Sequence, residues 1–110
     1  MAGSSTPAPG GPVRGSTTGR PLMAALDLLG RRWTLRLLWE LRDDPLGPRA
    51  ILARCDGLSS SVLYRRLADL EQAGLAAREA GGTYALTDLG CELGEAMTPL
   101  SRWSEKWARR

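Results

Sequence analysis

One stretch of this chain, residues 58–75, combines an apolar stripe at helical spacing with a defined start and a defined end. Its stripe consists of Leu63, Leu67 and Leu70. These intervals place the three side chains on one side of a helix, so that side must pack against other parts of the protein. Ser59 has a hydroxyl suited to capping a helix, and Gly74 stands where a helix commonly ends. The stretch predicts a helix over about residues 59–73 that is packed on one face only.

The outer face of this predicted helix carries residue types that read DNA. Small residues allow close approach, hydroxyls reach phosphates or base edges, and arginine can make paired hydrogen bonds to guanine. An ordinary amphipathic surface helix is the alternative that this stretch alone leaves open. We predict that the helix enters a DNA major groove through Ser59, Ser60, Ser61, Tyr64 and Arg65.

The distribution of charge supports this interpretation better than the net charge does. The formal net charge is only +3, which by itself does not argue for nucleic-acid binding. Within residues 45–66, however, four arginines accompany a single acid, Asp56. They are Arg49, Arg54, Arg65 and Arg66. We expect Arg49 and Arg54, with Arg78 further along the chain, to contact phosphates.

The residue composition argues against several kinds of site. The chain has no histidine, and its two cysteines, Cys55 and Cys91, stand far apart. We find no metal-ligand spacing, nucleophile-base pair or phosphate-cradling glycine loop, so we expect no enzyme, no metal site and no cofactor. Two unpaired thiols fit a reducing cytoplasm.

The first twenty residues differ in composition from the rest. Residues 1–20 are rich in Gly, Ser, Thr and Pro and lack apolar periodicity, so we expect a disordered tail. Residues 21–110 have the length of one domain with a small core. No apolar run resembles a signal peptide or membrane span, so we expect a cytoplasmic protein that associates with the nucleoid through DNA.

Two helices are expected after this tail. The first runs from Pro21, a residue suited to the first turn, to Gly30. The second covers residues 31–43 and is apolar nearly all round, so it should be central and buried. We expect Trp33 and Trp39 within it to be core residues rather than a platform for stacked bases.

The next segments have the order of a winged helix. Residues 48–55 predict a short helix, and a turn at Asp56-Gly57 connects it to the predicted DNA helix, which is the helix-turn-helix pattern. Short extended runs at 75–80 and 83–87 flank two glycines, which favours a tight hairpin. The fold expected is mainly α with a small β-hairpin.

A last helix is expected from about residue 88 to residue 109, capped by Thr87 and kinked or broken at Pro99. Its apolar stripe continues beyond what a small core can cover. This surplus is a candidate dimer interface, with Met97, Leu100, Trp103 and Trp107 as its expected members.

Taken in order, these segments resemble the HxlR-type branch of bacterial winged-helix transcription regulators, within the MarR-like superfamily. The resemblance rests on the run Gly-Arg-Arg-Trp-Thr-Leu within residues 25–41, on residues 57–75, and on Tyr-Ala-Leu-Thr-Asp-Leu-Gly at 84–90. Trp103 fits a tryptophan near the C-terminus of the family. The match covers about residues 21–107 in unbroken order.

The resemblance implies a homodimer that binds a near-palindromic operator in double-stranded DNA. The helix matching 59–73 would enter the major groove, and the hairpin would act as the wing. The first and last helices would build the dimer, which adds Leu22 and Leu26 of the first helix to the expected interface. Arg66, an arginine typical of the family, would either form a salt bridge within its own domain or contact a phosphate.

Two departures from the family pattern affect these expectations. Many relatives carry a sensing cysteine just before the first helix, where this chain has Gly19-Arg20-Pro21, so we expect no thiol switch there. Cys55 either fills the helix-turn-helix corner or senses oxidants. The wing is also short, and Arg78 is the basic residue expected to contact DNA from it.

An alternative function is a winged-helix module for protein–protein contact with lost or weak DNA binding. A small-molecule effector between the domain and the dimer helices, near the tryptophans, is a further possibility that the sequence leaves open.

Overall fold

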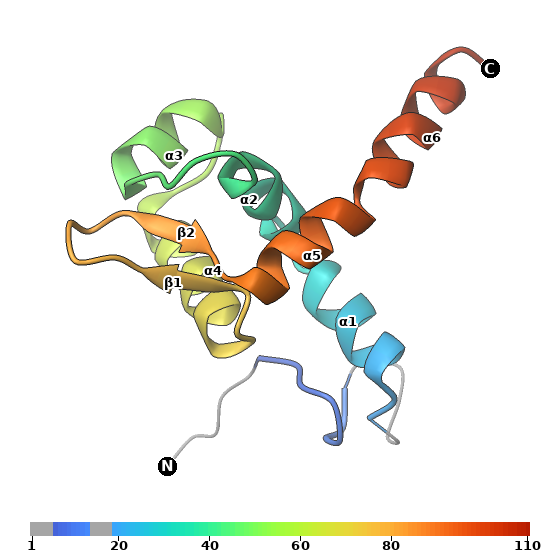
Figure 1. The fold of residues 1–110 in the computed structure, drawn as a ribbon, viewed down its shortest axis with the longest axis horizontal. Helices are drawn as coiled ribbons and strands as arrows, with labels where there is room; N and C mark the ends of the chain where they lie inside the picture. The colour runs from blue at the N-terminus through green and yellow to red at the C-terminus, as the bar shows by residue number, and fades with distance from the viewer. Residues whose placement is uncertain (1–5, 14–18) are drawn as a thin grey trace.

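The computed structural model of the protein describes residues 6–13 and 19–110. Helices dominate this part of the chain, as predicted, and α6 projects from a body formed by the other elements (Figure 1). In chain order the elements are α1 (Pro21–Leu29), α2 (Thr34–Leu41), α3 (Pro48–Arg54), α4 (Ser60–Gln72), β1 (Ala76–Arg78), β2 (Tyr84–Leu86), α5 (Asp88–Ala96) and α6 (Thr98–Ala108). No helix among the described residues combines the length and apolar character needed to cross a bilayer.

The core forms where α2, α3 and α4 pack together. Its most deeply buried apolar side chains are Leu37, Leu38, Ile51, Leu63, Leu67 and Leu70. The apolar stripe predicted for α4 is thus fully buried, because α2, α3 and β1 all pack against this helix.

Helix α2 begins at Thr34, three residues later than predicted. Trp33 has a φ of 77°, in the left-handed region, which the helix cannot include. Trp33 packs against the core as expected. Trp39 does not: it is half-buried at the surface, and the guanidinium carbon of Arg42 lies 3.6 Å from its ring centre. The prediction that Trp39 is a core residue was therefore wrong, because the neighbouring elements cover only part of this helix.

The hairpin pairs Ala76 with Leu86 and Arg78 with Tyr84. Its turn is longer than the tight one predicted, since the Glu79 amide donates to the Thr83 carbonyl at 2.8 Å and Gly82 takes a φ of 88°. Leu46 adds a single bridge to Tyr84 on the other side of β2. This bridge attaches the wing to the loop before α3.

The predicted break at Pro99 is confirmed, because α5 ends at Ala96 and α6 starts at Thr98 with the proline in its first turn. Thr87 caps α5 as expected: its hydroxyl accepts from the Gly90 amide at 3.1 Å. A Cβ at Gly90 would collide with the Leu75 carbonyl oxygen, so glycine allows α5 to lie close to the chain before β1.

Residues 6–13 lie beside α1 and the end of α4, whereas we expected disorder throughout residues 1–20 (Figure 1). Pro7 is buried, and the Thr6 hydroxyl donates to Asp69 Oδ1 at 2.7 Å. A segment without apolar periodicity can be held in this way, by burial of a proline ring and by hydrogen bonding of a hydroxyl to a carboxylate. Residues 1–5 and 14–18 lie outside the described residues, so the expectation for them stays a prediction.

Candidate nucleic-acid interface

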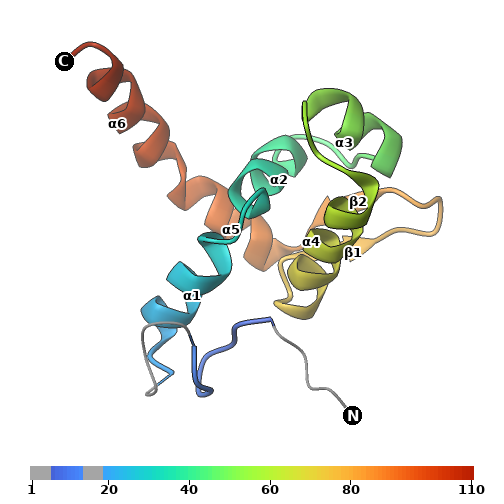
Figure 2. The same cartoon turned by 180° about the vertical axis from the view of Figure 1, so that it is seen from behind.

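The helix-turn-helix is formed by α3, a turn and α4, and α4 lies in front of the hairpin in the view from behind (Figure 2). Gly57 takes a φ of 85° in the turn, a conformation that suits glycine. The Ser59 hydroxyl accepts from the Val62 amide at 3.3 Å, which confirms Ser59 as the cap. The turn and the cap fix where α4 begins.

The outer face of α4 is exposed from its first turn onward. Ser60, Ser61 and Arg65 are exposed, and Tyr64 retains 53% of its accessible surface. Arg65 makes no ion pair with any residue that the structure describes. The side chains that we predicted to read bases therefore lie together on one accessible face of a helix whose opposite face is buried.

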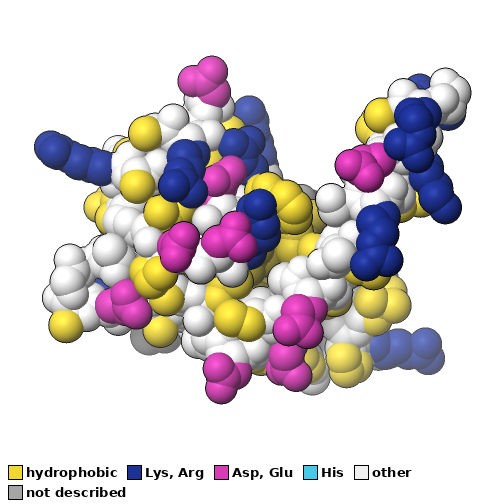
Figure 3. Space-filling model, turned by 45° about the horizontal axis from the view of Figure 1, so that its top comes forward, with side chains coloured by type: hydrophobic (Ala, Val, Ile, Leu, Met, Phe, Trp, Pro, Cys, Tyr) yellow, Lys and Arg dark blue, Asp and Glu magenta, His cyan; other side chains and the backbone are white. Residues whose placement is uncertain are grey.

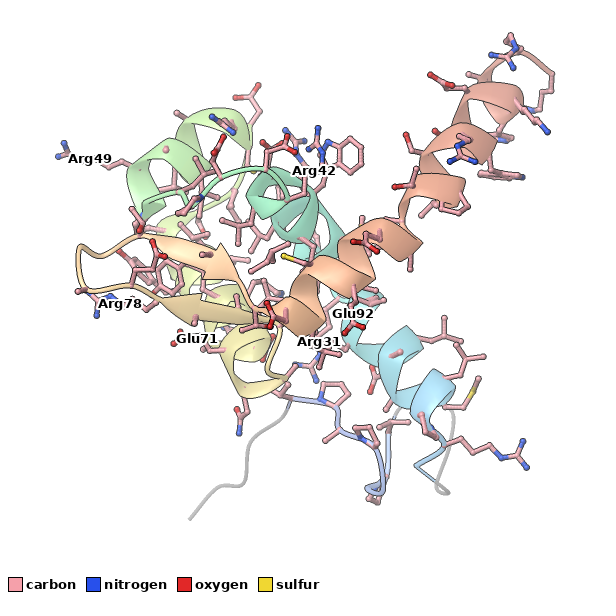
Figure 4. The ribbon with its side chains drawn as sticks, in the orientation of Figure 1. Arg31, Arg42, Arg49, Glu71, Arg78 and Glu92 are labelled. Carbon is pink, nitrogen blue, oxygen red and sulfur yellow. The ribbon has the colours of Figure 1, made fainter. Side chains whose placement is uncertain are left out.

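The three arginines predicted to contact phosphates have different surroundings. Arg49 on α3 and Arg78 on β1 project at the end of the molecule opposite α6, and neither is paired within the described part of the chain (Figure 4). Arg54 lies 3.6 Å from Glu40, a carboxylate that also pairs with Arg36 at 2.8 Å. Glu40 therefore partly offsets the charge of Arg54, whereas no described acid does so for Arg49 or Arg78.

The turn of the wing carries an acid rather than further bases. Glu79 follows Arg78, and its carboxylate accepts from the Thr83 hydroxyl at 2.8 Å. This local hydrogen bond shapes the turn. Arg78 is left as the only basic side chain of the hairpin.

Arg66 does not belong to the exposed face. Its Nη1 lies 3.1 Å from Asp69 Oδ2, and its Nε donates to the Arg32 carbonyl at 2.9 Å. Of the two roles left open for Arg66, the structure shows the salt bridge. Its partner Asp69 is buried and also meets Arg31 at 3.4 Å. Sequence reasoning missed Asp69, although an acid three residues after an arginine at the border of an apolar stripe was a usable signal.

The two cysteines differ in accessibility. Cys55 is 1% exposed in the core beside the helix-turn-helix corner, whereas Cys91 is exposed. Burial raises the pKa of the Cys55 thiol, and this outweighs the opposing influence of Arg36. Cys55 thus has the burial of a packing residue rather than the access that a sensor needs.

Five of the six residues predicted for a dimer interface are largely exposed. Leu22, Leu26, Leu100, Trp103 and Trp107 keep between 50% and 64% of their accessible surface. The rings of Trp103 and Trp107 stack on each other at 5.8 Å on α6, a helix that also carries basic side chains where it projects in Figure 3. Met97 differs, because it is half-buried and packs against the core. The prediction of surplus apolar surface thus holds for α1 and α6 but not for Met97.

Comparison with known proteins agrees with this geometry. The model of the HxlR-like helix-turn-helix family matches residues 28–110. An HTH-type transcriptional regulator of Bacillus subtilis, YvaP, is 30% identical over 89 residues, which is 76% of this chain and 82% of YvaP. The quinone-bound YodB of B. subtilis superposes with a TM-score of 0.73 at 28% identity, covering 78% of this chain and 96% of YodB.

A possible HxlR family transcriptional factor of Thermoplasma volcanium is similar as well, with a TM-score of 0.72 and 31% identity over 82% of this chain and 86% of that protein. The family match covers the helix-turn-helix, the wing and both C-terminal helices. The chain is therefore a member of the HxlR-like helix-turn-helix family of DNA-binding transcriptional regulators.

Proposed function

We propose that the protein acts as a homodimer that reads a near-palindromic operator, with α4 of each protomer in a major groove. The observation that carries this proposal is the division of α4 into two faces. Leu63, Leu67 and Leu70 are completely buried, so the helix is fixed to its domain, while Tyr64 and Arg65 are exposed. A helix held rigidly on one side and bearing a tyrosine, hydroxyls and a free arginine on the other suits base recognition.

Phosphate contacts would come from the elements before and after α4 in the chain. Arg49 lies on α3 and Arg78 on the wing, and both project at the end of the molecule opposite α6 (Figure 4). Contacts to phosphates set the register of a helix in the groove, and contacts to base edges then supply sequence preference. Arg54 would contribute less, because Glu40 already attracts it.

The dimer would form through α1 and α6, which carry exposed leucines and tryptophans. A two-fold dimer presents two copies of α4 in opposite directions, and an operator with two inverted half-sites matches that symmetry. The rival function is a protein-contact module with lost or weak DNA binding. The acid in the wing, Glu79, is the observation in its favour.

An electrophoretic mobility shift with the DNA upstream of the protein's own gene tests this proposal. We expect one shifted complex that contains two protomers and resists excess unrelated DNA. Selection from random DNA should return inverted half-sites whose centres are about 10 base pairs, or a multiple of that, apart. A protein that binds the upstream DNA no better than unrelated DNA, at both low and physiological salt, would favour the protein-contact function.

A further inference from the structure

An apolar cavity of about 900 Å³ lies between the N-terminal segment, α1, the end of α4 and the start of α5. This volume is within the range of about 300–1,000 Å³ in which small-molecule sites occur. It lies between the domain and α1, one of the two helices proposed for the dimer, and no tryptophan is among its described lining residues. Its walls come from four separate parts of the chain.

The residues that line this cavity favour an uncharged ligand. Alanine, leucine and proline side chains predominate, among them Ala25, Leu28 and Leu93. Among the lining residues that the structure describes, Glu92 is the only charged one and none is basic. An anion entering this cavity would lose water without meeting a positive charge, whereas an uncharged apolar molecule would lose little.

One wall is formed by residues 6–9, and this wall is connected to α4. Pro7 is buried, and the Thr6 hydroxyl donates to Asp69 Oδ1 at 2.7 Å. The same carboxylate receives Arg66 of α4 at 3.1 Å and Arg31, before α2, at 3.4 Å. A buried carboxylate that collects donors from three segments holds them in fixed relation.

We propose that this cavity binds an uncharged, largely apolar small molecule and that the hydrogen bond between Thr6 and Asp69 holds its N-terminal wall closed. The ligand binds the state in which the wall is docked. Binding and wall closure therefore strengthen each other.

Because Asp69 belongs to α4, occupation of the cavity also acts on the helix that meets DNA, a step that rests on the proposed function. The ligand adds contacts to the wall, the wall holds Thr6 on Asp69, and Asp69 holds Arg66. Ligand binding in the cavity thereby regulates DNA binding.

Binding of N-phenylnaphthylamine, an uncharged dye that fluoresces in apolar surroundings, tests the site on the full chain. We expect saturable binding of one dye per protomer at micromolar concentration. Anilinonaphthalene sulfonate, which adds a negative charge to a similar skeleton, should bind at least about tenfold more weakly. Equal affinity for the two dyes would contradict the chemistry assigned to the lining.

Two substitutions locate the dye. Ala25→Phe fills the cavity from α1 and should weaken dye binding by about tenfold or more. The matched control, Ala53→Phe, places the same ring at an exposed alanine of α3 and should leave dye binding unchanged. If Ala25→Phe does not fold, Thr6→Val tests whether the dye binds in this cavity, because it changes only the N-terminal segment. It should weaken the dye by about tenfold, while Thr6→Ser should bind as the wild type does.

Several outcomes would overturn the proposal. Dye binding that survives both Ala25→Phe and Thr6→Val would place the dye elsewhere. Dye affinity that falls as protein concentration rises through the range of dimerisation would show that a second copy occupies the cavity.

In saturating dye, operator affinity should change by about fivefold in the wild type and stay constant in Thr6→Val. An equal change in both proteins would show that dye binding is not coupled to operator binding through Asp69. If the wild type binds no operator at all, the proposed DNA function fails, while the dye measurements still decide the site.

Discussion

Helices α4 and α6 are both amphipathic, yet only α4 has its apolar face covered. In α4, Leu63, Leu67 and Leu70 have no accessible surface. In α6, the equivalent stripe of Leu100, Trp103 and Trp107 is at least half exposed, and no residue of the helix is buried. An amphipathic pattern thus shows that a helix has a face to bury, but it does not show what covers that face.

The difference arises from the neighbours of each helix. Helix α4 packs against α2, α3 and β1, whereas α6 follows α5 directly and projects away from the body (Figure 1). Large apolar patches on a monomer commonly mark an interface. In the proposed homodimer, a second protomer covers the exposed stripe of α6.

Removing α6 tests the largest consequence of this contrast. Truncation after Thr98 deletes Leu100, Trp103 and Trp107 and should abolish the dimer. Sedimentation velocity at micromolar concentration should show a dimer for the full chain and a monomer for the truncated chain. Circular dichroism should confirm that the remaining helices stay folded. A full-length protein that sediments as a monomer and still binds a palindrome tightly would contradict this assignment.

The two helices should also respond differently to the same small change. Leu67→Ala creates a cavity in the core and should lower the free energy of unfolding by about 2–5 kcal/mol. Leu100→Ala, measured in dilute solution where the protein is monomeric, should change it by about 0.5 kcal/mol or less. Chemical denaturation measures both variants. Equal losses in the two would mean that α6 is packed within its own protomer.

On the exposed face of α4, Arg65→Ala should weaken operator binding by about 1–3 kcal/mol and relax base preference, because a paired contact to a base is lost. Arg102→Ala on α6 provides the control, since it removes an exposed arginine from the other helix. Titration of the operator and of single-base variants measures both effects. Unchanged affinity and preference in a folded Arg65→Ala protein would exclude Arg65 as a reader.

Operator affinity should fall with salt along a log–log line of slope about −0.9 per phosphate neutralised. Arg49→Ala or Arg78→Ala should each flatten this slope by about one unit without altering base preference. Arg54→Ala should flatten it less, because Glu40 lies 3.6 Å from Arg54. If none of the three substitutions changes the slope, the DNA binds to another face of the protein.

The smallest effect is expected from oxidants. Cys55 is buried and its thiol pKa is raised by burial, so little thiolate forms at neutral pH and a mild oxidant or a quinone should leave operator binding intact. Operator binding is measured before and after treatment in the wild type and in Cys55→Ser. Release in the wild type that disappears in Cys55→Ser would identify Cys55 as a sensor.

Several features of the fold could be predicted from sequence because they depend on neighbouring residues. Ser59 and Thr87 cap the helices that follow them through bonds to amides three residues away. Pro99 separates α5 from α6 because it lacks an amide donor. The spacing of the leucines in α4 likewise predicted its buried face.

Other features depended on residues far apart in the chain. Asp69 binds Thr6 and Arg31, which lie 63 and 38 positions away, so no local pattern could indicate that these groups meet. Trp39 and Met97 follow the same apolar patterns as their neighbours. Only the packed structure shows that Trp39 lies at the surface and that Met97 packs against the core. Caps, breaks and helix faces were set by sequence because hydrogen bonds and side-chain directions along a helix are local. The burial of each face, the role of Arg66 and the cavity beside α1 were decided by tertiary structure, because each depends on which distant segments pack together.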